Sequence, residues 1–128
     1  MNYLVVCGNK EDKIRMIQKF FLALKICGSE GWQLDLVNFE IKHKHGVTIF
    51  IRSINQLNGK ANKTYHGIYR SSTYNLMETY ETSRLYDYHY MRMIHKFDKD
   101  NNFLHRLIRK AEGKINHGKR PKSSKTRI

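Results

Sequence analysis

The two histidines of the segment His43–Lys44–His45 are the residues whose type and spacing could most directly do chemistry. Side chains two residues apart on a strand point to the same side, so the pair could hold a divalent metal ion. However, the central residue is a charged lysine, and the segment falls at an expected turn. We therefore favour an exposed basic hairpin tip that contacts phosphate, and keep a metal-dependent nuclease using His43 and His45 as an alternative.

A second group combines aromatic rings with cations. Five of the eight tyrosines fall within residues 74–90, among arginines and histidines. Tyrosine rings can stack on bases while cations contact phosphates. The alternative is that about half of these rings belong to the core, because the apolar ring and polar hydroxyl of tyrosine suit a half-buried position. In both cases the face that carries Arg84, Arg92 and Lys96 is basic.

The charge of the whole chain points the same way. The 128 residues contain 24 Lys and Arg against 11 Asp and Glu, a formal net charge of +13. Such an excess attracts polyanions, chiefly nucleic acid, and less often an acidic protein or an acidic membrane surface. It is greatest after His105, where we expect the following residues to contact phosphates: Arg106, Arg109, Lys110, Lys114, Lys119, Arg120 and Lys122. The alternative is a tail that only improves solubility.

Other kinds of chemistry find little support in the sequence. The segment 98–102 begins like a calcium loop, but Phe103 stands at the sixth position, where glycine is required, and Arg109 at the twelfth, where glutamate is required. A phosphate-binding glycine loop, an HExxH motif, a Ser/His/Asp order and paired carboxylates among apolar residues are all missing. We therefore expect no cofactor, no metal and no catalytic site.

The element around which the fold is expected to form is a β-hairpin over residues 33–54. In its first arm Val37, Phe39 and Ile41 alternate with polar residues, as in a strand with one buried face. In the second arm Phe50 interrupts the alternation and indicates apolar contact on both faces. Gly46 supplies the turn, because glycine adopts positive φ at little cost.

The flanking segments are expected to cover this hairpin. The predicted elements are a buried strand over 1–8, a helix over 10–26 capped by Asn9, a strand over 64–71, a helix over 76–97, and a short last helix capped by Asn101 or Asn102 with Leu104, Leu107, Ile108 and Ala111 facing inward. The predicted fold is therefore α+β, a small sheet built on the central hairpin with an N-terminal strand, one covering helix and C-terminal helices. Residues 1–112 are expected to form one domain and residues 113–128 a basic tail.

Location and source follow from composition. Cys7 and Cys27 have neither metal-binding nor redox spacing, which is typical of reduced thiols in an intracellular protein. No apolar run is long enough for a membrane span, and no signal sequence follows Met1, so we expect no membrane association. The abundance of Lys, Asn, Ile and Tyr fits an A+T-rich genome, and with the small size it suggests a phage or viral accessory protein.

Two resemblances to known families can be stated. The histidine pair resembles the metal-binding pair of rolling-circle replication nucleases, although the residue between the histidines is apolar in that family. The segments YLVVCGN, KEDKIRMIQKFFLALK, NFEIKHKHGVTIFIRS and QLNGKANKTYHGIY, within residues 1–72, resemble the middle of the P-loop ATPase domain of phage terminase large subunits. The phosphate-binding loop is missing, and Tyr69, Arg70 and Ser71 replace the acidic pair. The resemblance therefore implies a nucleic-acid-handling or partner-binding remnant without ATP hydrolysis.

The leading hypothesis from the sequence is a non-catalytic nucleic-acid-binding protein, for DNA or RNA, in which the cations named above contact phosphates. The main alternative is an inhibitor or adaptor that places its basic face on an acidic or nucleic-acid-binding groove of a host or viral protein.

Overall fold

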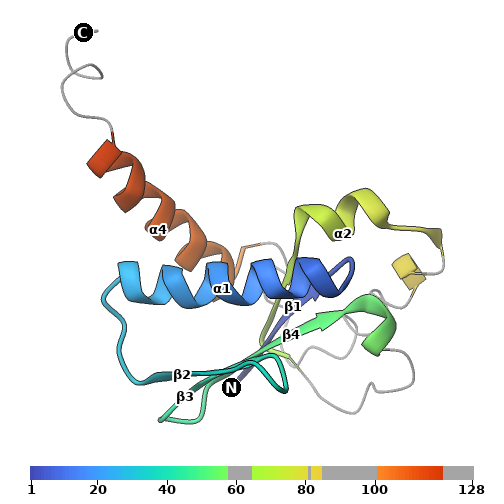
Figure 1. Cartoon of the computed structure of the whole chain (residues 1–128), viewed down its shortest axis with the longest axis horizontal. Coiled ribbons are helices and arrows are strands. Elements are labelled where there is room, and N and C mark those ends of the chain that lie inside the picture. The colour runs from blue at the N-terminus through green and yellow to red at the C-terminus, as the bar shows by residue number, and fades with distance from the viewer. Residues whose placement is uncertain (58–64, 81, 85–100, 120–128) are drawn as a thin grey trace, which may run out of the picture.

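A five-stranded mixed β-sheet with helices packed on it forms the protein (Figure 1). The computed structural model describes residues 1–57, 65–80, 82–84 and 101–119. The strands are β1 (Asn2–Cys7), β2 (Trp32–Asp35), β3 (Glu40–His43), β4 (Thr48–Ser53) and β5 (Gly67–Arg70), in the spatial order β2-β3-β4-β1-β5. The helices are α1 (Lys10–Ile26), the 3₁₀ turn η1 (Ile54–Leu57), α2 (Ser72–Met77) and α4 (Phe103–Lys119). The predicted α+β class is confirmed.

Strand β1 lies inside the sheet and pairs in parallel with β4 on one side and β5 on the other. Its side chains alternate between two apolar clusters. Val5 and Cys7 face the cluster formed with α1 and α4, whereas Leu4 and Val6 face the opposite cluster, which includes Tyr74. Burial on both faces explains why this strand is a continuous apolar run in the sequence.

The predicted hairpin is correct in its second half and wrong in its first. Residues 36–39 form a turn, so the predicted first arm is divided into β2 and β3. The Asp35 carboxylate accepts hydrogen bonds from the backbone N–H groups of Val37 and Asn38, both at 3.0 Å, and Phe39 has a φ of +53°. Val37 is consequently 88% exposed. The local hydrogen bonds of an aspartate turn outweigh the strand propensity of valine and phenylalanine here.

The turn between β3 and β4 agrees with the prediction. Gly46 adopts a φ of +93°, and β3 and β4 pair antiparallel. Phe50 is buried in the cluster opposite α1, so its break in the alternation indicates contact on both faces, as predicted.

Helix α1 has the predicted bounds and runs across one face of the sheet (Figure 1). The Asn9 side chain accepts a hydrogen bond from the Asp12 N–H at 2.8 Å, which confirms the predicted cap. Its inner face buries Ile17, Phe20 and Leu24.

Helix α4 packs beside α1 on the same face, and its predicted inward residues Leu104, Leu107, Ile108 and Ala111 are all buried. Asn102 caps it: Oδ1 accepts from the Leu104 N–H at 2.9 Å, and Nδ2 donates to the Ile68 carbonyl at 3.0 Å, which joins the helix to β5. The helix is longer than expected. It continues past Gly113, where we predicted the start of the tail, to Lys119.

The long helix predicted over residues 76–97 does not begin as expected. Ser71 caps α2, because its Oγ accepts a hydrogen bond from the Tyr74 N–H at 3.0 Å, and the helix therefore starts at Ser72. It ends before Glu78, whose backbone is extended. Residues 85–97 of the predicted helix, with Tyr86, Tyr88 and Tyr90, and residues 120–128 of the predicted tail lie outside the described residues.

Two glycines lead to opposite predictions for the same substitution. A Cβ atom on Gly67 would lie 2.7 Å from Cγ of Asn102, the buried cap of α4, whereas a Cβ on Gly113 would meet nothing within 4 Å. We expect Gly67→Ala to destabilise the fold by about 1–3 kcal/mol, the usual cost of overpacking. We expect Gly113→Ala to stabilise it by about 0.5–1 kcal/mol through helix propensity. Urea denaturation of both variants measures the difference, and equal effects would contradict this placement of Asn102.

Candidate nucleic-acid interface

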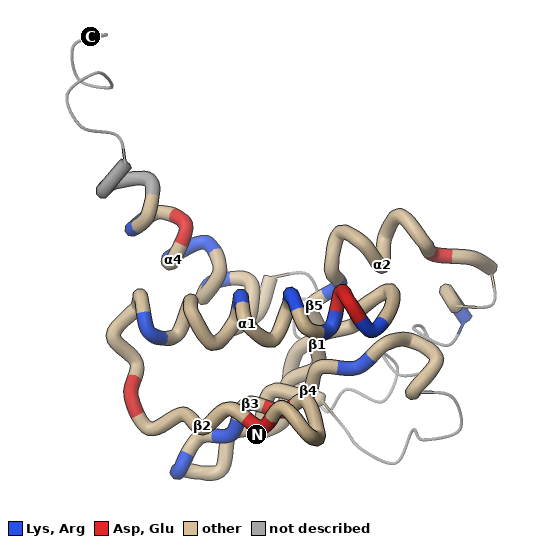
Figure 2. Tube along the Cα trace, in the orientation of Figure 1, with Lys and Arg blue, Asp and Glu red and all other residues tan. Residues whose placement is uncertain are grey.

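The exposed side of α4 carries a row of cations, which we call the α4 basic face: Arg106, Arg109, Lys110 and Lys114. At 3.6 residues per turn these positions lie on the side opposite the buried leucines of the helix. Figure 2 shows Lys and Arg residues along α4 with one acidic residue, Glu112, among them. The periodicity that buries one side of α4 therefore gathers positive charge on the other.

Within the described residues, no carboxylate pairs with a cation of the α4 basic face. Among the residues that the structure describes, none of its four cations forms an ion pair; Arg109 donates instead to the amide oxygen of Asn101 at 2.8 Å. The sheet differs. There Arg52 pairs with Glu40 at 2.6 Å, and Lys42 lies 3.4 Å from the same carboxylate. The α4 basic face is thus available to an external polyanion.

The hairpin tip at His43–Lys44–His45 has a fixed geometry. Nδ1 of His43 accepts a hydrogen bond from the His45 N–H at 3.1 Å, so a neutral His43 ring carries its proton on Nε2, which lies 2.9 Å from the Glu30 carbonyl oxygen. Lys44 and His45 are exposed. Both ring nitrogens of His43 are therefore engaged with the backbone.

This geometry does not favour a metal site. The rings of His43 and His45 are tilted by 42° with centroids 5.0 Å apart, and His45 lies in the turn rather than on β3. Within the described ranges no group of three or more His, Cys, Asp and Glu side chains is placed to hold a metal ion. Coordination by His43 would require one of its two hydrogen bonds to break.

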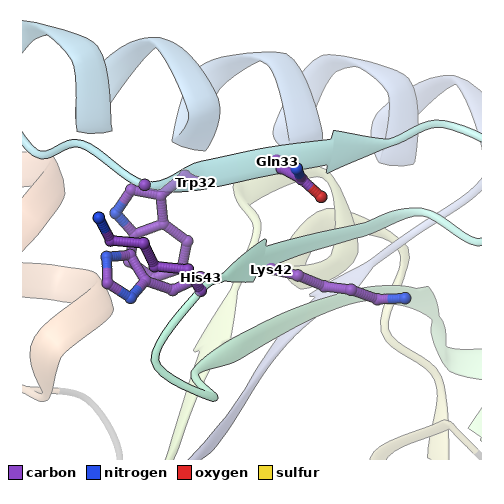
Figure 3. A pocket seen from close by; sticks show the side chains of 6 residues that line it. Trp32, Gln33, Lys42 and His43 are labelled. Atoms are coloured by element: carbon purple, nitrogen blue, oxygen red, sulfur yellow. The ribbon is translucent and has the colours of Figure 1, made fainter.

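A pocket of about 360 Å³ lies beside the hairpin tip. It is lined by Gly31, Trp32, Gln33, Lys42, His43 and Lys44. Figure 3 shows Trp32 and His43 close together, with ring centroids 4.7 Å apart, and the Lys42 side chain extending away from them. Trp32 and the exposed Lys44 thus line one pocket, and an aromatic ring beside a cation is a combination that can stack a base and contact its phosphate.

The hairpin tip and the start of α4 lie at the same side of the sheet. This side, where β1, β4 and β5 begin, we call the amino edge. The N-terminal ammonium of Met1 donates to the Gly46 carbonyl at 3.1 Å, and Met1 and Arg106 line a common pocket. Met1 therefore contacts the turn at the hairpin tip and shares a pocket with Arg106, the first cation of the α4 basic face.

The other predicted cations are not part of this surface, as far as the structure describes them. Arg84 is exposed and lies over the Tyr80 ring, 5.8 Å from its centroid, in the segment after α2, at the opposite edge of the sheet. Lys119 ends α4, but its side chain lies outside the described part. Arg92, Lys96, Arg120 and Lys122 also lie outside the described residues.

The opposite edge, which we call the carboxyl edge, contains a buried polar cluster that the sequence analysis did not single out. Asp12 is 1% exposed; its carboxylate accepts from the Gly8 N–H at 2.9 Å and from the Ser71 hydroxyl, and it pairs with Arg15. Since every partner comes from a different segment, the carboxylate joins the start of α1 to the ends of β1 and β5. Asp12 therefore has a structural role.

Next to Asp12, Lys13 is buried beneath the turn between β2 and β3. Its ammonium donates to the side-chain oxygen of Gln56 at 3.0 Å and lies 4.4 Å from the centroid of the Phe39 ring. Burial, together with the nearby Arg52, lowers the pKa of Lys13. On β1, burial raises the pKa of the Cys7 thiol, which makes it a poor nucleophile.

Some residues of the amino edge could not be found from sequence. Trp32 and the Met1 ammonium have no local signal, because their place depends on the strand order. The α4 basic face does have a local sequence signal, since its cations recur three and four residues apart.

Comparison of the chain with protein-family models, with curated proteins and with solved structures found no match. The terminase and rolling-circle nuclease resemblances thus remain predictions from the sequence. Within the described part of the chain, no helix has the length and apolar character needed to cross a membrane.

Proposed function

We propose that this protein binds nucleic acid without catalysis, through the α4 basic face and the hairpin tip. The observation that carries the proposal is the α4 basic face itself: four exposed cations on one side of a docked helix, with no carboxylate paired to any of them among the described residues. Cations spaced in this way neutralise phosphates and release counterions.

The amino edge adds an aromatic contribution. Trp32 lines the pocket together with Lys44, so a base could stack on the indole ring while Lys44 contacts a phosphate of the same strand. Because an indole ring stacks on any base, this contact favours accessible bases rather than one sequence. The arrangement supports a preference for single-stranded over duplex nucleic acid.

A set of three substitutions tests the proposal. We expect Arg109→Gln, Lys110→Gln and Lys114→Gln together to weaken binding to a labelled single strand at least tenfold, measured by fluorescence anisotropy at about 0.1 M salt, because three phosphate contacts are lost. The side chains are exposed, so the fold is retained.

The matched control removes the same charge elsewhere. Lys10→Gln, Lys19→Gln and Arg84→Gln change three exposed cations on α1 and after α2 and lower the net charge equally. We expect a loss of less than threefold. Equal losses in the two triple variants would mean that only net charge matters and would refute the α4 basic face as an interface.

A further inference from the structure

A second pocket, of about 240 Å³, lies at the amino edge beside the first turn of α4. It is lined by Met1, Tyr3, His66, Asn101, Asn102, Phe103 and Arg106. None of these described lining residues carries a carboxylate, and three of them, Met1, Tyr3 and Arg106, bring positive charge or a hydrogen-bond donor. The pocket is separate from the one that contains Trp32.

The Tyr3 hydroxyl is the feature of this pocket that most needs a partner. Tyr3 is 8% exposed, and its ring is held between Phe103, with centroids 5.2 Å apart, and His66, with centroids 6.3 Å apart. Within the described part of the chain its hydroxyl makes no hydrogen bond. A buried polar group without a partner is unfavourable, and a bound acceptor would satisfy it.

The other groups around the pocket favour a negative ligand. The Arg106 guanidinium has no ion-pair or hydrogen-bond partner among the described residues, and it lies near enough to Tyr3 to oppose the rise in the pKa of that hydroxyl on burial. Nδ1 of His66 accepts from the Asn2 N–H at 3.2 Å, so a neutral His66 carries its proton on Nε2. The N-terminus of the 17-residue helix α4 adds the positive end of its dipole.

We propose that this pocket binds the terminal phosphate group of a nucleic-acid strand. A terminal phosphate carries between one and two negative charges and three strongly accepting oxygens, whereas an internal phosphodiester carries one charge and two free oxygens. Two donors meet at the pocket, a hydroxyl and a guanidinium, and the helix dipole adds partial positive charge. This proposal deepens the proposed function and rests on it, because the pocket lies where the α4 basic face begins, at Arg106.

The test compares oligonucleotides that differ only in their ends. Single strands of one sequence, with a phosphate or a hydroxyl at the 5′ end and separately at the 3′ end, are titrated by fluorescence anisotropy. We expect one phosphorylated end to bind about fivefold more tightly than its hydroxyl counterpart. Tyr3→Phe, which deletes the hydroxyl and keeps the ring, should remove this difference and leave binding of the unphosphorylated strand unchanged.

Lys110→Gln is the control, since it removes a cation of the α4 basic face that does not line the pocket. It should weaken all the strands by the same factor and preserve the fivefold ratio. Equal affinity for phosphorylated and unphosphorylated strands, or a ratio that survives in Tyr3→Phe, would overturn the assignment.

A second measurement distinguishes failure of this proposal from failure of the proposed function. It also distinguishes a strand end from a free phosphate compound as the ligand. Thermal unfolding is followed with inorganic phosphate or adenosine monophosphate, against chloride at equal ionic strength. If no strand binds, a phosphate-dependent rise in Tm that is lost in Tyr3→Phe still supports an anion pocket, whereas equal rises in both proteins overturn it. A third outcome is a rise in Tm that depends on Tyr3, together with equal affinities for phosphorylated and unphosphorylated strands. That outcome would assign the pocket to a free phosphate compound and overturn the strand-end assignment.

Discussion

Asp12→Ala is expected to lower the free energy of unfolding by about 3 kcal/mol, because the buried carboxylate satisfies two donors that have no other acceptor in place. The Gly8 N–H at 2.9 Å and the Ser71 hydroxyl both lose their partner. Ser71 also caps α2 through the Tyr74 N–H, so the loss extends to a second helix. Removal of an acid from the first turn of α1 adds a smaller penalty from the helix dipole.

Glu11→Ala is the matched control for this prediction. Glu11 lies in the same turn of α1 and carries the same charge, but its side chain is exposed. It should therefore cost no more than about 0.5–1 kcal/mol, the contribution of the dipole alone. Urea denaturation with an unchanged m-value measures both variants. Similar losses for the two would mean that Asp12 contributes only its charge and that the carboxyl-edge cluster does not hold the elements together.

Leu104→Ala is the second large effect, with an expected loss of about 3 kcal/mol. Leu104 is fully buried in the first turn of α4, inside the cluster shared with α1 and β1. Truncation leaves a cavity at the point where the helix meets the sheet, next to the Asn102 cap. Since α4 carries the proposed interface, a weakened α4 should also lose affinity for nucleic acid near its unfolding transition.

The same substitution at Leu22 provides the comparison. Leu22 is 55% exposed on the outer side of α1, and Leu22→Ala should change stability by less than about 1 kcal/mol. Thermal and urea unfolding give both values. A loss below 1 kcal/mol for Leu104→Ala would contradict the docking of α4 on the sheet.

The elements that could be predicted from the sequence are those whose hydrophobic period is long and regular. Apolar residues at helical spacing define the 17-residue helix α1, and the inward positions of α4 follow in the same way. The division of the first hairpin arm could not be predicted, because Val37 and Phe39 continue a strand-like alternation. Only the hydrogen bonds that the Asp35 carboxylate accepts from Val37 and Asn38 reveal that the chain turns there.

The candidate site also has a part that could be predicted from the sequence and a part that could not. The α4 basic face follows from local spacing, because cations three and four residues apart share one side of a helix. The amino edge does not, since it requires β1 to lie between β4 and β5, which brings Met1 to Gly46 and Arg106. Such a neighbourhood is set by strand order, and no period in the sequence encodes strand order.

The measurement that tests the central claim most directly is the salt dependence of binding to a labelled single strand, for the native protein and for the triple variant Arg109→Gln, Lys110→Gln, Lys114→Gln. The slope of log affinity against log salt should fall by about 2 in the variant, because each lost phosphate contact on a single strand contributes roughly 0.7. The slope of the Lys10→Gln, Lys19→Gln, Arg84→Gln control should remain within about 0.7 of the native value. Equal slopes for the native protein and the α4 variant would show that this helix releases no counterions, and the account of α4 as the nucleic-acid interface would then be wrong.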